Sequence, residues 1–361
     1  MKALTATLGT TDAHYRRLGL SRDSIEPWED GMRTDGSQGT YEWWYCDVYL
    51  NDGSKLAITF RTKPVVDVPK TIDPWIDLNL EQADGKNLIQ HLHFSPQQFT
   101  ASQKTCDVVM GSNTFKGDLH IYSIHVDAEG IVVDVILTGT TQPWRPETGC
   151  LFFGEHEEYY FAWLPAIPEG DAHVSITIDG GTPQSYTGIG YHDHNWSNIS
   201  MPKLMHDWYW ARGKIANYTL IVAYVTAEQR YGNKSFPLFM LAKDGKVIAD
   251  DTTKVRFRLS DVAMEPDTGK PVANQVSYEY TDGFERYMLT FTREKDLMHY
   301  KFIEELHGIK ALLARLIRFD GAYLRFTGEL SFEHYQAEQL VEAHRDEAMW
   351  ELMYLGHVIQ K

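Results

Sequence analysis

The sequence of 361 residues predicts an all-β protein with a few helices, made of two tandem antiparallel β-barrel or sandwich domains. Turn signals, in which Asn, Asp or Glu precedes Gly, recur between segments rich in Val, Ile, Tyr, Phe and Thr. Apolar and polar residues alternate from Tyr323 to Phe332, as they do on a strand with one buried face. Few stretches have helical spacing, which favours antiparallel sheets over a parallel sheet with crossover helices.

The turn signals place the expected hairpins along the chain. They lie at Asn51-Asp52-Gly53, Asp84-Gly85, Glu129-Gly130, Asp179-Gly180-Gly181 and Asp244-Gly245. Two helices are expected near the C-terminal end. Apolar residues at helical spacing predict one over 304–318, and a short second one is expected from Asp346 to Leu355, ended by Gly356.

A polar stretch that contains a proline, Ser197–His206, is the best candidate for a domain boundary. We therefore expect an N-terminal β domain over residues 1–200 and a C-terminal β domain over residues 201–361. Ligand pockets are common at such junctions, so a pocket is expected there.

Composition restricts the classes of ligand and location. The formal net charge of -16 opposes binding to nucleic acid and to anionic membranes, so the expected ligand is an uncharged hydrophobic small molecule. The apolar runs are shorter than the ~18 residues that a transmembrane span needs, and the first residues lack the apolar core of a secretory signal. We expect a cytoplasmic protein whose three cysteines are reduced thiols.

The densest group of chemically active side chains is Gly-Tyr-His-Asp-His-Asn-Trp at residues 190–196. On an extended strand His192, His194 and Trp196 point to one face, and Asp193 and its neighbour Asn195 point to the other. One face is then available to a ligand while the other anchors the strand. The histidines, Asp193 and Trp196 are therefore the catalytic candidates.

Three further aromatic clusters contain carboxylates, and their rings are suited either to line a ligand pocket or simply to pack in a core. The first, Glu42-Trp43-Trp44-Tyr45, places Trp43 and Tyr45 on one face of a strand. The substrate-binding candidates from all three clusters are Glu42, Trp43, Tyr45, Asp207, Trp208, Trp210 and Glu351.

Alternating histidines also raise the possibility of a metal site. His192 with His194, and His91 with His93, each share a strand face and offer imidazole ligands. The cysteines lack zinc-ligand spacing, and strand histidines often bind backbone or carboxylate groups instead, so no metal is expected. No nucleotide-binding or nucleophile-elbow motif is present in the sequence, so mechanisms that depend on these motifs have no support.

In their order along the chain, these motifs resemble the AttH-like family with tandem lipocalin-like domains, which includes carotenoid hydratases (hydroxyneurosporene synthases), kievitone hydratase and fungal Diels-Alderases. The segments that carry the resemblance are Glu42-Trp43-Trp44-Tyr45, Tyr160-x-x-Trp163-x-Pro165, Pro168-x-Gly170, residues 190–196, Trp208-x-Trp210 and Trp350-Glu351. Family members commonly have Gly after the motif's Trp, where this chain has Ser197.

The resemblance implies an isoprenoid or polyketide-like substrate, a hydrophobic pocket and no cofactor. In carotenoid hydratases the motif's His and Trp, carried here to His194 and Trp196, are thought to work with a Tyr and an Asp of the next domain. Tyr224 matches that Tyr, whereas Thr226 stands where the acid is expected.

We expect hydration or dehydration of a C=C bond in an unsaturated hydrophobic substrate. This reaction needs a proton donor and shelter for a carbocation, and a carboxylic acid buried among aromatic rings can be that donor. Asp193, Glu42 and Asp207 are the candidates. A pericyclic or other cyclisation of a similar substrate, or a noncatalytic carrier of a hydrophobic ligand, are the alternatives.

Overall fold

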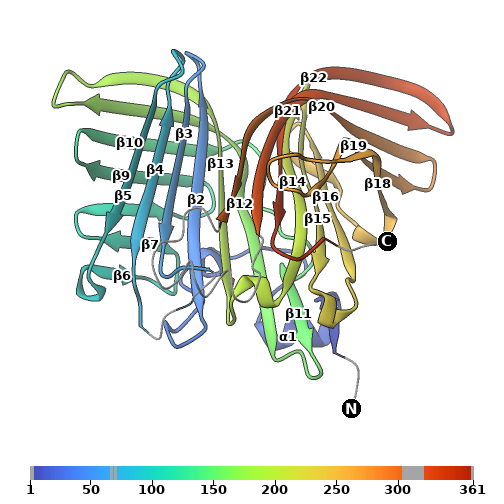
Figure 1. Ribbon diagram of the computed structural model, residues 1–361, viewed down its shortest axis with the longest axis horizontal. Coiled ribbons are helices and arrows are strands. Elements are labelled where there is room, and N and C mark those ends of the chain that lie inside the picture. The colour runs from blue at the N-terminus through green and yellow to red at the C-terminus, as the bar shows by residue number, and fades with distance from the viewer. Residues whose placement is uncertain (1–3, 66–67, 69–70, 303–320, 359–361) are drawn as a thin grey trace. The chain divides into compact units, whose positions relative to one another are not determined.

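The computed structural model of the protein describes residues 4–65, 68, 71–302 and 321–358. Its regular structure is dominated by strands in antiparallel pairs, which confirms the expected all-β class (Figure 1). The chain divides into a first unit, Thr7–Met201, and a second unit that comprises the described residues of Pro202–Lys361 and of Met1–Ala6.

The first unit contains a 13-stranded sheet with the order β5-β4-β3-β2-β13-β12-β10-β9-β8-β7-β6, beside which β11 pairs with β1 and β12. Its strands are β1 (Thr5–Leu8), β2 (Tyr41–Leu50), β3 (Lys55–Arg61), β4 (Trp75–Glu81), β5 (Asn87–His93), β6 (Phe99–Ala101), β7 (Cys106–Met110), β8 (Asn113–Gly117), β9 (Ile121–Ala128), β10 (Ile131–Gly139), β11 (Cys150–Gly154), β12 (Tyr159–Ile178) and β13 (Gln184–Ser197). Its short helices are α1 (Asp12–Leu18), η1 (Pro27–Asp30) and η2 (Pro96–Gln98).

The second unit contains a nine-stranded sheet with the order β17-β16-β15-β14-β22-β21-β20-β19-β18. Its strands are β14 (Met205–Ile215), β15 (Tyr218–Ala227), β16 (Ser235–Lys243), β17 (Lys246–Ala249), β18 (Val255–Met264), β19 (Pro271–Asp282), β20 (Glu285–Lys301), β21 (Ala322–Gln336) and β22 (Gln339–Tyr354). The 3-10 helices along this part of the chain are η3 (Met201–Lys203), η4 (Gln229–Tyr231) and η5 (Thr252–Lys254).

Each sheet curls around its own apolar core. In the first unit, buried side chains of β2, β3 and β4 share one core with those of β7 to β10, although these strands lie far apart in the strand order. In the second unit, buried side chains of β14 to β16 share a core with those of β19 to β22. The expected turns connect β2 to β3, β4 to β5, β9 to β10, β12 to β13 and β16 to β17, so the hairpin predictions are confirmed.

The predicted alternation in β21 is also confirmed, and it fixes which side chains of the second unit enter the core. Leu324, Phe326, Leu330 and Phe332 are buried, whereas the polar residues between them, Arg325, Thr327, Glu329 and Ser331, are half-buried. Gly328 lies on the same buried face beside a bulge of β20, where a Cβ atom would stand only 2.0 Å from the carbonyl oxygen of Thr292.

The expected helix from Asp346 to Leu355 is wrong, because residues 346–354 lie in strand β22 and Leu355 directly follows it. Every second residue from Ala348 to Tyr354 is buried, which is the period of a strand. Trp350 and Tyr354 are four residues apart and share a face in a helix and in a strand alike, so their spacing did not distinguish the two. The other expected helix, 304–318, lies outside the described residues. No helix in the described part of the chain is both long and apolar enough to cross a membrane.

The segment before β2 is fixed to the first unit by a buried ion pair. Arg145 Nε donates to Glu29 Oε2 of η1 at 2.8 Å, and both side chains are almost fully enclosed. The same guanidinium donates to the backbone carbonyls of Ser21, Ser24 and Glu147. This arrangement places the neighbouring Asp30 inside the unit, beside the motif of residues 190–196.

Candidate functional site

The motif of residues 190–196 lies on β13, between β12 and β2 in the middle of the first unit's sheet. Its side chains alternate between the two faces of the sheet as predicted. The histidines point to the face that carries the apolar core, and Asp193 and Asn195 point to the opposite face, so the motif forms two separate groups.

On the core side, both imidazoles contact carboxylates. His192 Nε2 lies 3.0 Å from Asp30 Oδ2, and its Nδ1 lies 2.9 Å from the backbone oxygen of Tyr45. His194 Nε2 lies 3.1 Å from Glu42 Oε2, and its Nδ1 lies 3.5 Å from Asp30 Oδ1. Asp30, Glu42, His192 and His194 thus form one chain of alternating acids and imidazoles, which we call the buried acid–imidazole cluster.

Both carboxylates of this cluster have further hydrogen-bond donors. Glu42 accepts from the backbone N–H of Arg33 at 2.9 Å and from the hydroxyl of Thr34 at 2.9 Å. Asp30 Oδ2 accepts from the hydroxyl of Tyr122 at 2.6 Å. Together with the contact between Asp30 and His192, these hydrogen bonds fasten the segment before β2 to strands β2, β9 and β13.

The electrostatics of the cluster favour a charged pair between Asp30 and His192. Burial acts to lower the pKa of His192, but the charge and hydrogen bond of Asp30 outweigh it, and the pKa is raised. Burial acts to raise the pKa of Asp30, but the two imidazoles and the Tyr122 hydroxyl outweigh it, and the pKa is lowered. The two shifts agree, since each stabilises the charged form of its group.

The imidazoles are enclosed by protein. His192 and His194 are 0 % exposed, and the rings of Trp44, Phe115 and Tyr122 pack against them. Half-buried Trp196 lies with its ring 4.7 Å from that of His194. This geometry gives the imidazoles a connecting role within the unit, and the predicted catalytic role of His192, His194 and Trp196 stays a prediction.

On the opposite face, Asp193 is surrounded by hydrogen-bond donors. Its Oδ2 accepts from Trp163 Nε1 at 2.8 Å and from the Tyr191 hydroxyl at 2.9 Å, and its Oδ1 accepts from the Asn195 amide at 2.9 Å. Burial nevertheless raises the pKa of Asp193 to about 6, because loss of solvation outweighs the hydrogen bonds from Trp163 and Tyr191. An acid of this strength is partly protonated near neutral pH.

The aromatic residues of β2 share this face with Asp193. Tyr45 is paired in register with Asp193 and Trp43 with Asn195, and both rings are half-buried. The Tyr45 hydroxyl donates to Asp47 Oδ2 at 3.0 Å. We call this group of side chains the Asp193 face; it consists of the half-buried Trp43, Tyr45 and Asp47 and the buried Trp163, Tyr191, Asp193 and Asn195.

The second unit has an aromatic and charged surface of its own, on the face of its sheet opposite its core. Trp210 is paired in register with Glu351, and Trp208 lies two residues away on the same side of β14. The Glu351 carboxylate accepts from the Tyr323 hydroxyl at 2.6 Å, and that hydroxyl accepts from Arg325 Nε at 3.1 Å. Three of the candidates from the sequence, Trp208, Trp210 and Glu351, are therefore brought together.

Asp207 and Tyr224 lie on the core side of the second unit instead. Tyr224 is paired with the buried Tyr209 and stacks on Phe257, with 3.7 Å between ring centroids. Thr226, which occupies the position where an acid was expected, donates from its hydroxyl to Asp207 Oδ1 at 3.2 Å. A carboxylate of the neighbouring strand β14 thus lies beside this position. His206 also contacts Asp207, and this carboxylate outweighs the effect of burial and raises the pKa of His206.

Two groups in the described residues have ligand atoms close enough together for a metal ion. Asp30, Cys106 and His192 are buried, and Glu265, Asp267 and His299 are mostly exposed. In the first group, Asp30 and His192 already bind each other and Asp30 also binds Tyr122. His91, from the other alternating pair, contacts Asp77 at 2.7 Å.

Sequence reasoning missed Asp30, whose partners lie far away in the sequence: His192 is 162 residues later. It also assigned no role to Tyr191, which stands inside the motif and donates to Asp193. The position of Tyr191, two residues before Asp193 on the same strand, was a usable signal, because residues i and i+2 share a face.

Comparison with known proteins gives matches over much of the chain. A family model described as Diels-Alderase-like matches residues 90–310. The quinolone epoxide rearrangement protein AsqO of Emericella nidulans is 26% identical over 147 residues, which are 39% of each chain. The Diels-Alderase CheD of Chaetomium globosum is 30% identical over 87 residues, which are 23% of this chain and 20% of CheD. The aligned stretches thus span less than half of these relatives.

Solved structures share the fold over nearly the whole chain. CghA in complex with Sch210972 has a TM-score of 0.59 at 14% identity and covers 98% of this chain and 99% of its own. The putative AttH NE1406 of Nitrosomonas europaea has a TM-score of 0.55 at 16% identity, covering 89% and 94%. Kievitone hydratase of Nectria haematococca has a TM-score of 0.50 at 12% identity, covering 90% and 91%. The resemblance predicted from the sequence motifs is confirmed.

Proposed function

Because this chain belongs to the Diels-Alderase-like family, we propose that it is a cofactor-independent enzyme that rearranges or cyclises a hydrophobic, unsaturated natural product of polyketide or isoprenoid type. The proposed proton donor is Asp193. The observation that carries the proposal is a buried carboxyl group with a pKa of about 6 among aromatic and amide side chains. The named activities of the relatives, epoxide rearrangement and Diels-Alder cyclisation, support the same reaction classes.

The surroundings of Asp193 suit a carboxylic acid that donates to a substrate oxygen. At pH 7 an acid with a pKa of about 6 is about one-tenth protonated, and at pH 6 about half. The fixed donors of Trp163, Tyr191 and Asn195 then stabilise the carboxylate that remains after proton transfer. The group needs little rearrangement between its two protonation states.

The strength of this acid favours activation of a substrate oxygen over protonation of a substrate carbon. An epoxide or carbonyl oxygen accepts a hydrogen bond or proton from a carboxylic acid far more readily than an alkene carbon does. Opening an epoxide or polarising a carbonyl before ring closure therefore fits Asp193 better than hydration of a simple C=C bond. Hydration remains the second candidate, because the same proton donor and aromatic shelter would be needed.

The other predicted residues receive distinct roles in this proposal. Trp43 and Tyr45 line the substrate on the Asp193 face, where their rings stabilise positive charge that develops on it. Trp208, Trp210 and Glu351 form a separate surface on the second unit, and their predicted role in substrate binding stays a prediction. The buried acid–imidazole cluster holds β2 and β13 in register, so it fixes the position of Asp193 without touching the substrate.

The proposal is tested by incubating the purified protein with unsaturated polyketide, terpenoid and quinolone epoxide extracts and identifying changed molecules by mass spectrometry. For a converted substrate, Asp193→Asn is expected to lower kcat by about 100-fold or more, the effect of removing a general acid. The matched control is Asp134→Asn, an exposed carboxylate of the same unit paired with His125, which should keep full turnover. Full turnover by Asp193→Asn contradicts the proposal. Release of only unchanged ligand at every protein concentration also contradicts it and supports a carrier.

A pH profile gives an independent readout. The rate should rise as pH falls from 8 and level off below about 6, because the acid form of Asp193 is the active one. Asp47 contributes to the raised pKa of Asp193 through its charge, so Asp47→Asn should move the profile to lower pH without abolishing turnover. If Asp47→Asn does not shift the pH profile, the fall in rate between pH 6 and 8 cannot be assigned to Asp193.

A further inference from the structure

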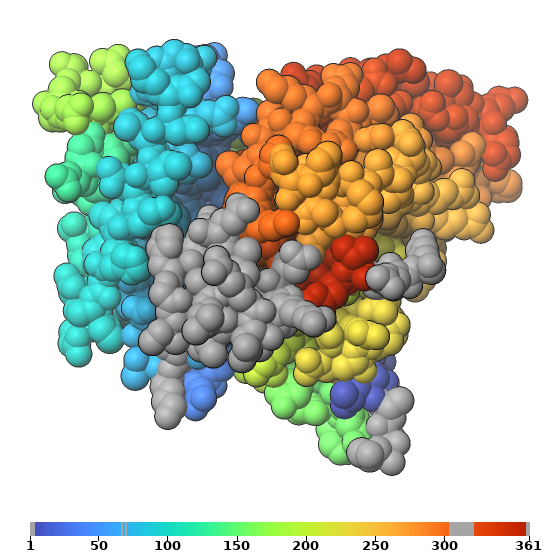
Figure 2. Space-filling view, viewed as in Figure 1, coloured from blue at the N-terminus to red at the C-terminus, as the bar shows by residue number. Residues whose placement is uncertain are grey.

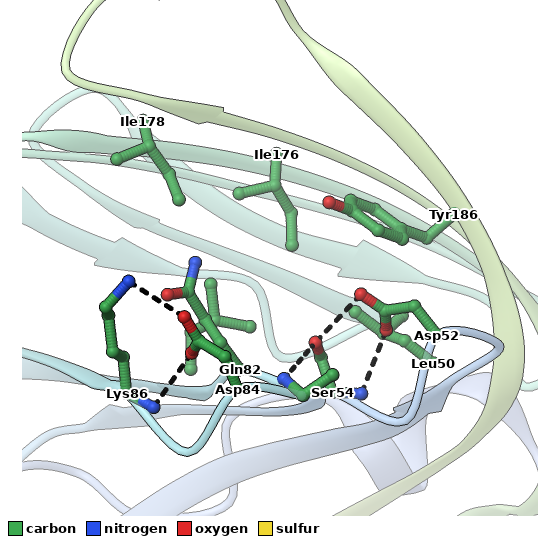
Figure 3. A pocket seen from close by; sticks show the side chains of 11 residues that line it. Leu50, Asp52, Ser54, Gln82, Asp84, Lys86, Ile176, Ile178 and Tyr186 are labelled. Atoms are coloured by element: carbon green, nitrogen blue, oxygen red, sulfur yellow. Dashed lines mark hydrogen bonds and ion pairs between the residues drawn. The ribbon is translucent and has the colours of Figure 1, made fainter.

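A cavity of about 330 Å³ opens at one end of the first unit, away from the Asp193 face. It lies between the β12–β13 hairpin on one side and the β2–β3 and β4–β5 turns on the other (Figure 3). Figure 2 shows the lime β12–β13 hairpin beside the cyan β4–β5 turn at the upper left. Tyr186 of the cavity precedes Asp193 by seven residues on β13, a separation of roughly 23 Å along a strand.

The floor of the cavity is apolar and continues the core of the first unit. Leu50, Leu80 and Ile176 are buried members of that core, and Ile178 and Tyr186 are half-buried beside it. The volume is within the range of small-molecule sites, which typically combine such apolar walls with a few polar groups. A hydrocarbon chain or ring placed here would leave water and meet the open end of the core.

The rim carries charge of mostly one sign. Lys86 binds Asp84 at 2.8 Å, so that pair is neutral, and the remaining charge is the carboxylate of Asp52. Each oxygen of Asp52 accepts one hydrogen bond from Ser54, at 2.9 Å to the backbone nitrogen and 2.9 Å to the hydroxyl. Among the described residues, no Lys or Arg forms an ion pair with Asp52.

The turn that carries Asp52 is held in place by its neighbour. The Ser54 hydroxyl, which donates to Asp52, accepts from the backbone N–H of Ala83 in the β4–β5 turn at 3.0 Å. This bridge fixes the carboxylate on one side of the cavity, across from Ile176, Ile178 and Tyr186 (Figure 3). A negative group in a fixed position over an apolar surface is complementary to a molecule with a hydrocarbon part and a positive head.

We propose that this cavity is a second binding site, which takes an amphipathic amine: a small hydrophobic molecule with a protonated nitrogen. The hydrocarbon part lies on Leu50, Leu80 and Ile176, and the ammonium group lies against Asp52. The site is separate from the Asp193 face and does not depend on the function proposed for it.

The test uses three eight-carbon probes that differ only in the head group: octylammonium, octanol and octanoate. Binding to the full chain at pH 7 is followed by NMR of isoleucine methyl groups labelled with carbon-13, since Ile176 and Ile178 report from the floor of the cavity. Octylammonium is expected to shift both methyl signals and to bind more tightly than octanol, with octanoate weakest. No shift at Ile176 or Ile178 with any probe would overturn the site.

Two variants separate the charge from the cavity. Asp52→Asn is expected to weaken octylammonium by about fivefold, the upper range for a partly exposed ion pair, and to leave octanol unchanged. Ile178→Trp fills the cavity and should abolish the response to all probes, whereas Ile121→Trp, at an exposed position of the same unit, should not. Equal binding of the three probes, or octylammonium binding that Asp52→Asn does not change, would overturn the preference for an amine.

Discussion

The pKa of Asp193 makes a quantitative prediction about stability. In the folded protein this carboxyl titrates at about 6, against an ordinary value of 3.8, because burial disfavours its charged form. The folded state therefore binds the proton more tightly than the unfolded state, so the stabilising contribution of this group is complete at low pH and is lost as pH rises from about 4 through about 6. The difference corresponds to about 3 kcal/mol.

Asp193→Asn removes this titration while keeping the shape of the side chain. The amide oxygen can replace Oδ2 as the acceptor for Trp163 and Tyr191, and the Asn195 amide can turn to present its oxygen to the new N–H groups. Removal of the titration stabilises the variant above pH 6.5 by up to about 3 kcal/mol, and imperfect hydrogen bonds of the amide cost about 1 kcal/mol. The variant is therefore expected to be more stable than the wild type above pH 6.5 by up to about 2 kcal/mol.

The assay is urea unfolding of both proteins at half-unit intervals from pH 4 to 8. The difference in free energy of unfolding should grow in favour of Asp193→Asn between pH 4 and 6.5 and remain constant above. A difference that does not vary across this range would show that the pKa of Asp193 is not raised, and both the stability argument and the proposed proton donor would be refuted.

Three further substitutions test the packing that supports the site. His192→Ala leaves Asp30 buried without its imidazole partner and should destabilise the first unit by about 3–5 kcal/mol, measured by urea unfolding; a loss below about 1 kcal/mol would contradict a buried charged pair. Arg145→Met removes the partner of Glu29 and the donor to three backbone carbonyls, so a loss of stability of similar size is expected. Differential scanning calorimetry should show this loss as a lower Tm, and an unchanged Tm would contradict it. Gly328→Ala should destabilise the second unit by about 1–3 kcal/mol or more, because the new Cβ atom would overlap Thr292. The control is Gly213→Ala, whose Cβ atom would meet no atom within 4 Å and which should be nearly neutral. Equal effects of the two substitutions would contradict the packing around Gly328.

Features that depend on neighbouring residues could be predicted from the sequence. The turns that contain glycine and the alternation in β21 are local patterns, and the structure reproduces them. The alternation of His192, Asp193 and His194 between two faces also follows from strand geometry alone. The error at β22 arose because residues four apart share a face in both helices and strands, while the period of two from Ala348 to Tyr354 was overlooked.

The partners of the site residues could not be predicted in the same way. Asp30 and Glu42 meet their imidazoles across 162 and 152 residues, and no local pattern marks such a pairing. The separation of the predicted site into an enclosed histidine side and a more accessible Asp193 side depends on which sheet face closes around the core. Motif composition alone does not contain that information, because both faces of β13 carry polar side chains.

These long separations have a consequence for the newly made chain as it leaves the ribosome. Strand β2 emerges early, but its neighbour β13 is translated some 140 residues later, so Glu42 and Asp30 stay in water until then. The middle of the first unit's sheet can therefore form only after its last strand, β13, has been synthesised. A nascent chain halted before His192 should remain sensitive to protease, whereas one halted well beyond Met201 should not. Synthesis of nearly the whole first unit must precede its folding, which makes this half of the protein dependent on late, distant contacts.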